Sequence, residues 1–235
     1  MASISITPVQ RLDLHFAPKQ WPFAQARRAE IDAHFKSMQQ QQSAMWNGRV
    51  LLLYESALSD GEFSGSFLET DFASFVAHRD WNFPDPQVRN CFGAGVLRAA
   101  DGAFLLGVMG AHTANAGKIY FPCGTPDPRD LVEDRVDFHG SILRELAEET
   151  GLTSADFKIA PGWHVVFEGQ RTAVLKVLQA KQSASEIRDR ILGFIASEHQ
   201  PELADVRIIR GPSDFDPMMP NFVPAFLRYL WRRGD

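Results

Sequence analysis

The sequence predicts an α/β protein: an α/β/α sandwich around a mixed β-sheet, preceded by a small α+β unit. Two observations support this prediction. Short runs of β-branched and aromatic residues alternate with helix-forming segments along the 235 residues. Hydrophobic residues make up 45% of the chain, which is enough for a sizeable core. We divide the chain into an N-terminal α+β domain, residues 1–88, and a larger domain, residues 89–235.

The N-terminal domain is expected to contain two helices and three strands. Residues 23–42 contain no Gly or Pro and carry Ala, Gln and charged residues, which favours a helix. The Trp-Asn-Gly sequence at residues 46–48 is a turn signal. The other elements expected here are a strand at residues 3–7, a hairpin of residues 50–54 and 63–69, and a helix at residues 71–79.

The larger domain is expected to alternate strands and helices. Asp101-Gly102 is a strong hairpin signal, and Ser183 with Glu186 has the capping-box pattern of a helix that continues through Ile195. The loop at residues 110–118 is small and polar, so it is either an ordinary connection or a place where a ligand approaches the backbone. The other expected elements are strands at residues 92–98, 103–108, 119–121, 163–168, 172–178 and 204–210, and a helix at residues 223–231.

Composition excludes several classes of protein. A formal net charge of −5 argues against nucleic acid as a partner, since that would require a clustered basic surface. Cys91 and Cys123 are far apart and form no C-x-x-C pair, so neither a disulfide framework nor a zinc site is indicated. No apolar run approaches 18 residues, and the N-terminus lacks a basic region followed by an apolar core. We expect a soluble, cytoplasmic protein that does not enter a membrane.

Residues 144–152 are the most informative stretch. They read as the last turns of a helix that stops at Gly151. Glu145, Glu148 and Glu149 stand at i, i+3 and i+4, so their carboxylates emerge on one helix face. Repulsion among them costs about 0.2–0.5 kcal/mol per pair, and a cluster of hard oxygens suits Mg²⁺ or Mn²⁺. The alternative is an ordinary solvated acidic helix end.

The order R-E-hydrophobic-x-E-E-x-G-hydrophobic in this stretch resembles the second half of the Nudix box, at all seven constrained positions. The resemblance implies a Nudix hydrolase fold, with Glu145, Glu148 and Glu149 as metal ligands. It also implies catalytic roles for Glu145, Glu149 and Arg144, with Arg144 bracing the loop and helix of the box.

The first half of the box departs from the family pattern. Asp130 and Val136 stand where the family has Gly and Glu, fourteen and eight residues before the Arg. Gly124 follows a strand-like segment and would be the first Gly of the box, which gives the loop an insertion of six residues. Asp137 is expected to replace the missing Glu structurally, as the N-cap of the helix.

Other site residues are expected near the box. A general base is expected from the region before the last strand, where we favour Glu202 over Glu198 because Pro201 fixes the backbone beside it. Each of the two could instead be a plain surface residue. The candidate substrate-binding residues, each of which could also be an ordinary surface or turn residue, are Arg89, Arg98, Lys118 and Gly124.

The resemblance extends loosely to the UDP-glucose pyrophosphatases that carry an N-terminal domain and a lengthened box loop. It implies a small-molecule substrate, a nucleoside diphosphate linked to another group, and an N-terminal domain that shapes substrate choice or a homodimer interface. The alternatives are a Nudix-fold nucleotide-binding regulatory module without turnover, and a structural protein whose acidic helix is incidental.

Overall fold

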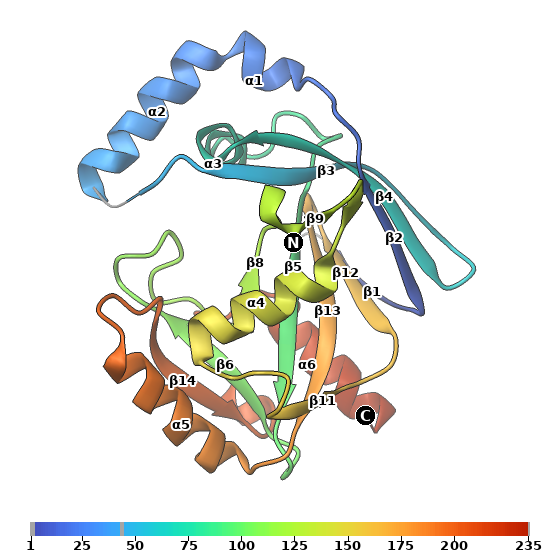
Figure 1. Cartoon of the computed structure of the whole chain (residues 1–235), viewed down its shortest axis with the longest axis vertical. Coiled ribbons are helices and arrows are strands. Elements are labelled where there is room, and N and C mark those ends of the chain that lie inside the picture. Colours follow the sequence, from blue (N-terminus) through green and yellow to red (C-terminus); the bar gives the residue numbers. More distant parts are fainter. Residues whose placement is uncertain (1–2, 43–44, 235) are drawn as a thin grey trace.

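The computed structural model describes residues 3–42 and 45–234, which form two β-sheets with helices packed around them (Figure 1). The larger sheet has the strand order β1-β12-β13-β5-β6-β14, and the smaller has the order β3-β4-β2-β10-β9. The strands of the larger sheet are β1 (Ile4–Val9), β5 (Asn90–Arg98), β6 (Phe104–Met109), β7 (Ile119–Tyr120), β8 (Cys123–Gly124), β11 (Phe157–Ile159), β12 (Trp163–Glu168), β13 (Arg171–Ala180) and β14 (Leu203–Ile209). Those of the smaller sheet are β2 (Arg11–Phe16), β3 (Arg49–Ser59), β4 (Glu62–Asp71), β9 (Leu131–Val132) and β10 (Arg135–Val136).

Both sheets are mixed, so the predicted α/β class is confirmed. In the larger sheet β13 and β5 run parallel, whereas their outer neighbours pair antiparallel. In the smaller sheet β2 and β4 run parallel and β3 pairs with β4 as a hairpin. The helices are α1 (Pro22–Ala26), α2 (Arg28–Gln41), α3 (Phe72–Asp80), α4 (Phe138–Thr150), α5 (Ala184–Ser197) and α6 (Phe222–Arg233).

Alternation along the central strands builds the layers of the larger domain. Phe92, Ala94 and Val96 of β5 belong to the core that α6 covers. Leu97 belongs to the core on the opposite face, to which α4 and α5 contribute Leu146 and other apolar residues. Successive strand residues point to opposite faces of a sheet, so one strand serves both cores. Figure 1 shows α4 in front of the sheet and α6 behind it.

Two glycines let α4 lie unusually close to β5. A Cβ atom at Gly93 would stand 2.7 Å from Cγ1 of Ile142, and one at Gly95 would stand 3.4 Å from Cγ2 of the same residue. Side chains at these two positions would therefore push α4 away from the sheet. The acidic motif lies on this helix, so the glycines also set its distance from the sheet.

The two sheets share a core across the predicted boundary at residue 88. β1 pairs with β12 of the larger sheet, and Arg135 of β10 pairs with His15 of β2 in the smaller one. A third core cluster joins Phe67 of β4 to Phe138 of α4 and Val174 of β13. The division at residue 88 stays a prediction about folding units. β1, which precedes it, belongs to the larger sheet, and β9 and β10, which follow it, belong to the smaller one.

Most predicted elements are present, with some differences. The helix expected at residues 23–42 is broken into α1 and α2 at Arg27, whose backbone angles, φ −112° and ψ 21°, are not helical. The strands β2, β9, β10 and β11 were not expected from the sequence. β2 is rich in charged residues, and its pairing with β4 and β10 places only Leu14 in the buried core.

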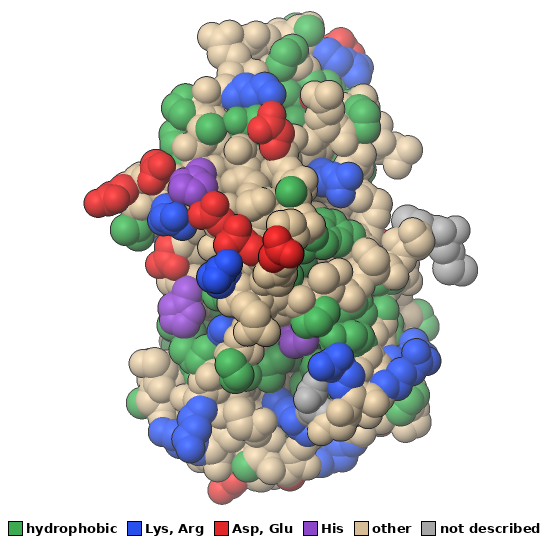
Figure 2. Space-filling model, turned by 90° about the vertical axis from the view of Figure 1, so that its right-hand side faces the viewer, with side chains coloured by type: hydrophobic (Ala, Val, Ile, Leu, Met, Phe, Trp, Pro, Cys, Tyr) green, Lys and Arg blue, Asp and Glu red, His purple; other side chains and the backbone are tan. Residues whose placement is uncertain are grey.

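Within the described residues, no helix is both long enough and apolar enough to cross a membrane. Figure 2 shows one face of the molecule, on which most acidic side chains lie in the upper half, whereas Lys and Arg side chains lie in both halves. The acidic side chains are therefore not spread evenly over this face.

Candidate active site

The helix α4 begins and ends as the sequence predicts. The side chain of Asp137 accepts a hydrogen bond from the backbone N–H of Gly140 at 3.0 Å and so caps the first turn. Gly151 ends the helix in the left-handed conformation, with φ 69°. A Cβ atom at Gly151 would also stand 2.5 Å from the ring of Phe194, so packing and backbone both require glycine there.

The three glutamates of α4 differ sharply in burial. The side chain of Glu148 is 55% exposed and that of Glu145 only 18%. Glu149 is buried, and its Oε1 accepts a hydrogen bond from the backbone N–H of Cys123 at 3.2 Å. Its other oxygen, Oε2, is buried and has no hydrogen-bond partner in the described part of the chain. One helix face thus presents an exposed, a half-buried and a buried carboxylate.

Gly124 allows the strand β8 to contact these carboxylates directly. A Cβ atom at this position would stand 2.4 Å from the carboxyl carbon of Glu145, closer than real Cβ contacts occur. Since Gly124 pairs with Gly93 of β5, the turn that carries it is held against the central sheet. A side chain at Gly124 would therefore displace the carboxylate of Glu145.

Arg144 joins the acidic helix to the loop that precedes it. Its guanidinium forms ion pairs with Glu145 at 2.7 Å, with Glu148 at 3.1 Å and with Asp130 at 3.0 Å. Asp130 is buried and also accepts hydrogen bonds from the hydroxyl of Ser141 at 3.1 Å and the backbone N–H of Asp127 at 3.0 Å.

Sequence reasoning treated Asp130 only as a departure from the box pattern. It is the main partner of Arg144 outside α4, and its side chain is 3% exposed. A signal was present, because Asp127, Pro128 and Asp130 have the composition of a capped turn, and that turn is a short 3-10 helix with a capping box. The inserted residues of the loop form this turn and the small β9–β10 hairpin.

The pKa values of the acidic residues reflect burial and mutual repulsion. Burial raises the pKa of Glu145 to about 7, against the opposing charge of Arg144. Burial raises the pKa of Glu149 well above its ordinary range, and the charges of Glu202 and Glu145 raise it further. These groups hold negative charge only against an electrostatic cost that a bound cation would relieve.

Glu202, the candidate base, interacts electrostatically with the α4 carboxylates. Although the residue reaches the surface, burial of its carboxyl group is the main cause of its raised pKa, and the charge of Glu148 adds to it. The backbone carbonyl of Glu202 accepts a hydrogen bond from the N–H of Gly110 at 2.7 Å, so the small-residue loop at 110–118 is fastened beside it. Glu198 lies at the end of α5 and is exposed.

The donors suit a hard divalent cation, although they do not already surround one point. Among residues 3–42 and 45–234, no three His, Cys, Asp or Glu side chains are grouped as a metal site. Arg144 draws Glu145 and Glu148 toward itself, while Glu149 turns toward β8. All the donors are carboxylate oxygens, and the unpartnered Oε2 of Glu149 is the acceptor that a metal ion would satisfy.

A cavity of about 520 Å³ reaches the strand β8. Cys123 and Gly124, which contact Glu149 and Glu145, form part of its wall, and Lys118, a candidate substrate-binding cation, lines it. Its other lining residues include five aromatic side chains, two further cations and four polar groups: Phe72, Phe75, Phe92, Tyr120, Phe222, Arg79, Arg171, Asn90, Asn115, Asn221 and Glu168.

Two predicted substrate-binding cations lie elsewhere. Arg89 lines a separate cavity of about 280 Å³ with Lys19 and Glu55. Arg98 lies at the opposite end of β5 from Asn90, and its guanidinium lies over the ring of Phe104 at 5.8 Å. The cavity beside α4 instead receives Arg79 and Arg171, which carried no signal in the sequence.

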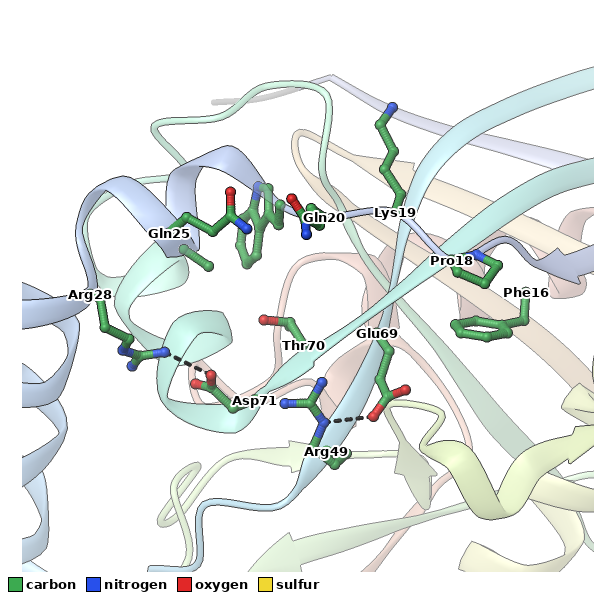
Figure 3. Close-up of a pocket in the computed structure, with 12 residues that line it drawn as sticks. Phe16, Pro18, Lys19, Gln20, Gln25, Arg28, Arg49, Glu69, Thr70 and Asp71 are labelled. Carbon is green, nitrogen blue, oxygen red and sulfur yellow. Dashed lines mark hydrogen bonds and ion pairs between the residues drawn. The ribbon is translucent and has the colours of Figure 1, made fainter.

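A cavity of about 800 Å³ lies in the N-terminal part of the chain (Figure 3). Two of its cations are already neutralised. Arg28 pairs with Asp71 at 2.7 Å, and Arg49 pairs with Glu69 at 2.6 Å. Cys123, which donates a hydrogen bond to Glu149, lines the 520 Å³ cavity and not this one, so size alone does not make this cavity the candidate site.

The buried Asp130 should be needed for stability. Asp130→Asn replaces an oxygen that accepts hydrogen bonds with an N–H₂ group that faces other donors. We expect the free energy of unfolding to fall by about 1–3 kcal/mol. Urea denaturation measures this, with Asp134→Asn as the control, because the Asp134 side chain is 70% exposed and pairs only at the surface with His15. Equal effects of the two substitutions would contradict the structural role of Asp130.

The raised pKa of Glu145 should make the metal-free protein less stable as pH rises. A carboxyl group that binds its proton more tightly when folded contributes stability below its unfolded pKa, and this contribution is lost as the pH rises through about 7. Glu145→Gln removes the carboxyl group that titrates at this position. Between pH 5 and pH 8, with chelator present, the wild type should lose about 1–3 kcal/mol relative to the variant in urea denaturation. A difference that stays constant over this range would argue against the raised pKa.

Sequence comparison finds no match among protein families or among curated proteins. Solved structures that resemble the chain include a MutT protein from Methanosarcina mazei Go1, with 20% identity, 63% of this chain and 96% of that chain covered, and a TM-score of 0.43. A Nudix hydrolase from M. smegmatis has 16% identity, covers 62% and 86%, and has a TM-score of 0.40. A bifunctional NMN adenylyltransferase/ADP ribose pyrophosphatase from Francisella tularensis, complexed with AMP and a Mn ion, has 15% identity, covers 68% and 46%, and has a TM-score of 0.42.

Proposed function

We propose that this protein is a Nudix hydrolase that uses a divalent metal ion to cleave a nucleoside diphosphate linked to a second group. The observation that carries the proposal is the buried carboxylate of Glu149, which has an unpartnered oxygen. Its other oxygen, Oε1, accepts a hydrogen bond from the backbone N–H of Cys123, and Cys123 lines a cavity that also holds cations and aromatic rings. The match of residues 144–152 to the second half of the Nudix box agrees with this assignment.

In this proposal, Glu145, Glu148 and Glu149 hold Mg²⁺ or Mn²⁺. The metal ion would supply positive charge that stabilises the charge developing on the phosphate oxygens and would lower the pKa of a bound water. Arg144, fixed by Asp130, orients the side chain of Glu145. Glu202 accepts the proton of the attacking water, since a raised pKa brings a carboxylate closer to that of an effective general base.

The cations of the cavity would bind the phosphates. Lys118 and Arg171 line it together with Gly124, next to the acidic helix. We further propose that the second group is a sugar, so that the substrate is a nucleotide sugar such as UDP-glucose. The N-terminal segment supplies Phe72, Phe75 and Arg79 to the same wall, which supports its proposed part in substrate choice.

A screen of the purified protein tests this proposal. The candidates are nucleotide sugars, ADP-ribose, dinucleoside polyphosphates, coenzyme A and nucleoside triphosphates, each with Mg²⁺. We expect at least one to release a nucleoside monophosphate and a phosphorylated product, and chelation to abolish the release, because all the proposed ligands are oxygen atoms that a chelator outcompetes. Turnover that survives exhaustive chelation would exclude the proposed chemistry.

A regulatory module that binds nucleotide without cleaving it is the second candidate. The altered first half of the box, with Asp130 and Val136 in place of Gly and Glu, favours it. Such a protein would take up metal and nucleotide in calorimetry and release no product in the screen.

Glu149→Gln should separate the charge of this residue from its packing. Without metal, the variant should be as stable as wild type or more stable by about 0.2–0.5 kcal/mol, because a repelling pair is removed. With Mg²⁺ the order should reverse, since metal stabilises only the protein that binds it. Turnover should fall by orders of magnitude. Thermal melts with and without Mg²⁺, paired with a rate assay, measure these effects.

The matched control for this test is Glu133→Gln, a change of an exposed glutamate in the β9–β10 turn. It should leave the melts and the rate unchanged. Unchanged turnover in Glu149→Gln, together with wild-type stabilisation by Mg²⁺, would remove Glu149 from the metal site.

A further inference from the structure

Glu168 carries an unfilled carboxylate oxygen at the wall of the cavity beside α4. It is the last residue of β12 and lines the cavity. Its Oε1 accepts a hydrogen bond from the side-chain N–H of Asn221 at 3.1 Å. Its Oε2 is buried and has no hydrogen-bond partner in the described part of the chain. A buried acceptor without a donor is costly, so this oxygen is suited to a donor that a ligand brings.

Arg171 does not neutralise this carboxylate. Glu168 and Arg171 face each other across the β12–β13 hairpin, yet no ion pair joins them within residues 3–42 and 45–234. Both side chains line the cavity. The cavity therefore offers a hydrogen-bond acceptor and a cation side by side, as a ligand with both hydroxyl or N–H groups and phosphates requires.

Aromatic rings line the same cavity as this acceptor. Phe92 and Phe222 line the same cavity, and their rings meet edge to face with centroids 5.6 Å apart. Phe222 follows Asn221, the partner of Glu168, in the chain. Aromatic faces of this kind stack with the flat heterocycle of a base, at about 1–3 kcal/mol per base. Glu168 thus lies where a nucleoside can be held.

The strand register relates this acceptor to Gly124. On β5, Asn90 pairs with Arg171 and Gly93 pairs with Gly124. Three residues of a strand span about 10 Å. Gly124, Asn90 and Glu168 line the same cavity, so a ligand with its phosphates at Gly124 can hold its nucleoside at Asn90 and Glu168 within that cavity.

We propose that Glu168 is a specificity-determining residue that accepts a hydrogen bond from the nucleoside half of the substrate. The donor is a ribose hydroxyl or an N–H of the base. This inference rests on the proposed function for the identity of the ligand. The role of Glu168 concerns nucleotide binding and not cleavage, so this inference and the proposed hydrolase function can fail separately.

Calorimetric binding tests the proposal without turnover. The probes are the α,β-methylene analogues of ADP, GDP, UDP and CDP, which lack the cleavable P–O–P bridge, in buffer with Mg²⁺. Glu168→Gln keeps the shape of the side chain and exchanges an acceptor oxygen for an N–H₂ group. It should weaken binding of the preferred analogue at least tenfold, while the control Glu55→Gln, an exposed change on β3, should bind like wild type.

Analogues that lack one donor identify its source. If a ribose hydroxyl is the donor, the 2′-deoxy or 3′-deoxy form of the preferred analogue should bind wild type and Glu168→Gln with similar affinity. If the base is the donor, the variant should keep its defect with both deoxy forms and lose it with a base that lacks the N–H. Both outcomes support the proposal.

Two results would overturn it. One is equal affinity of wild type and Glu168→Gln for every probe, and the other is failure of the wild type to bind any probe. Glu168→Asp, which retains the charge and withdraws the acceptor by one methylene, should also bind more weakly, and it replaces Glu168→Gln if melting shows that the latter is unfolded. If the wild type binds the probes but cleaves no diphosphate, the proposed function fails while the role of Glu168 stands.

Discussion

The close contact of α4 with the central sheet is the constraint on which the site depends. Gly93 and Gly95 let the helix approach β5, and Gly124 lets β8 touch its carboxylates. As a result, Glu149 and much of Glu145 are removed from water although both side chains are ionisable. Burying like charges together is unfavourable unless a cation compensates them. The packing that builds this core therefore makes a positive charge beside these carboxylates stabilising.

Arg144 supplies part of this positive charge from within the protein. Its single guanidinium is shared among Glu145, Glu148 and the buried Asp130. Among residues 3–42 and 45–234, the one hydrogen-bond donor to the Glu149 carboxylate is the N–H of Cys123. Breaking a buried ion pair leaves its partner uncompensated, which is why such networks hold their members in fixed positions. The inserted loop thus contributes to the site through Asp130, although it provides none of the proposed metal ligands.

The cavity depends on both sheets and on segments far apart in the sequence. The smaller sheet and α3 bring Phe72, Phe75 and Arg79 to the wall, the loop before the box brings Lys118, and the start of α6 brings Phe222. Because β1 and β10 each pair with a strand of the other part of the chain, the two sheets hold one another in place. Substrate choice, in the proposed function, is therefore a property of the whole chain.

The sequence by itself determined the local features. Helix periodicity brought Glu145, Glu148 and Glu149 to one face, Asp137 and Gly151 marked the ends of α4, and the turn signals located most strands, because these depend on residues near in the chain. Only the tertiary structure decided that Glu149 is buried and that Arg144 pairs with Asp130. It also decided that Arg171 and Glu168 line the cavity, whereas Arg89 and Arg98 do not. The physical reason is that burial, charge compensation and cavity lining arise from contacts between strands and helices distant in sequence. The spacing of residues along the chain does not predict such contacts.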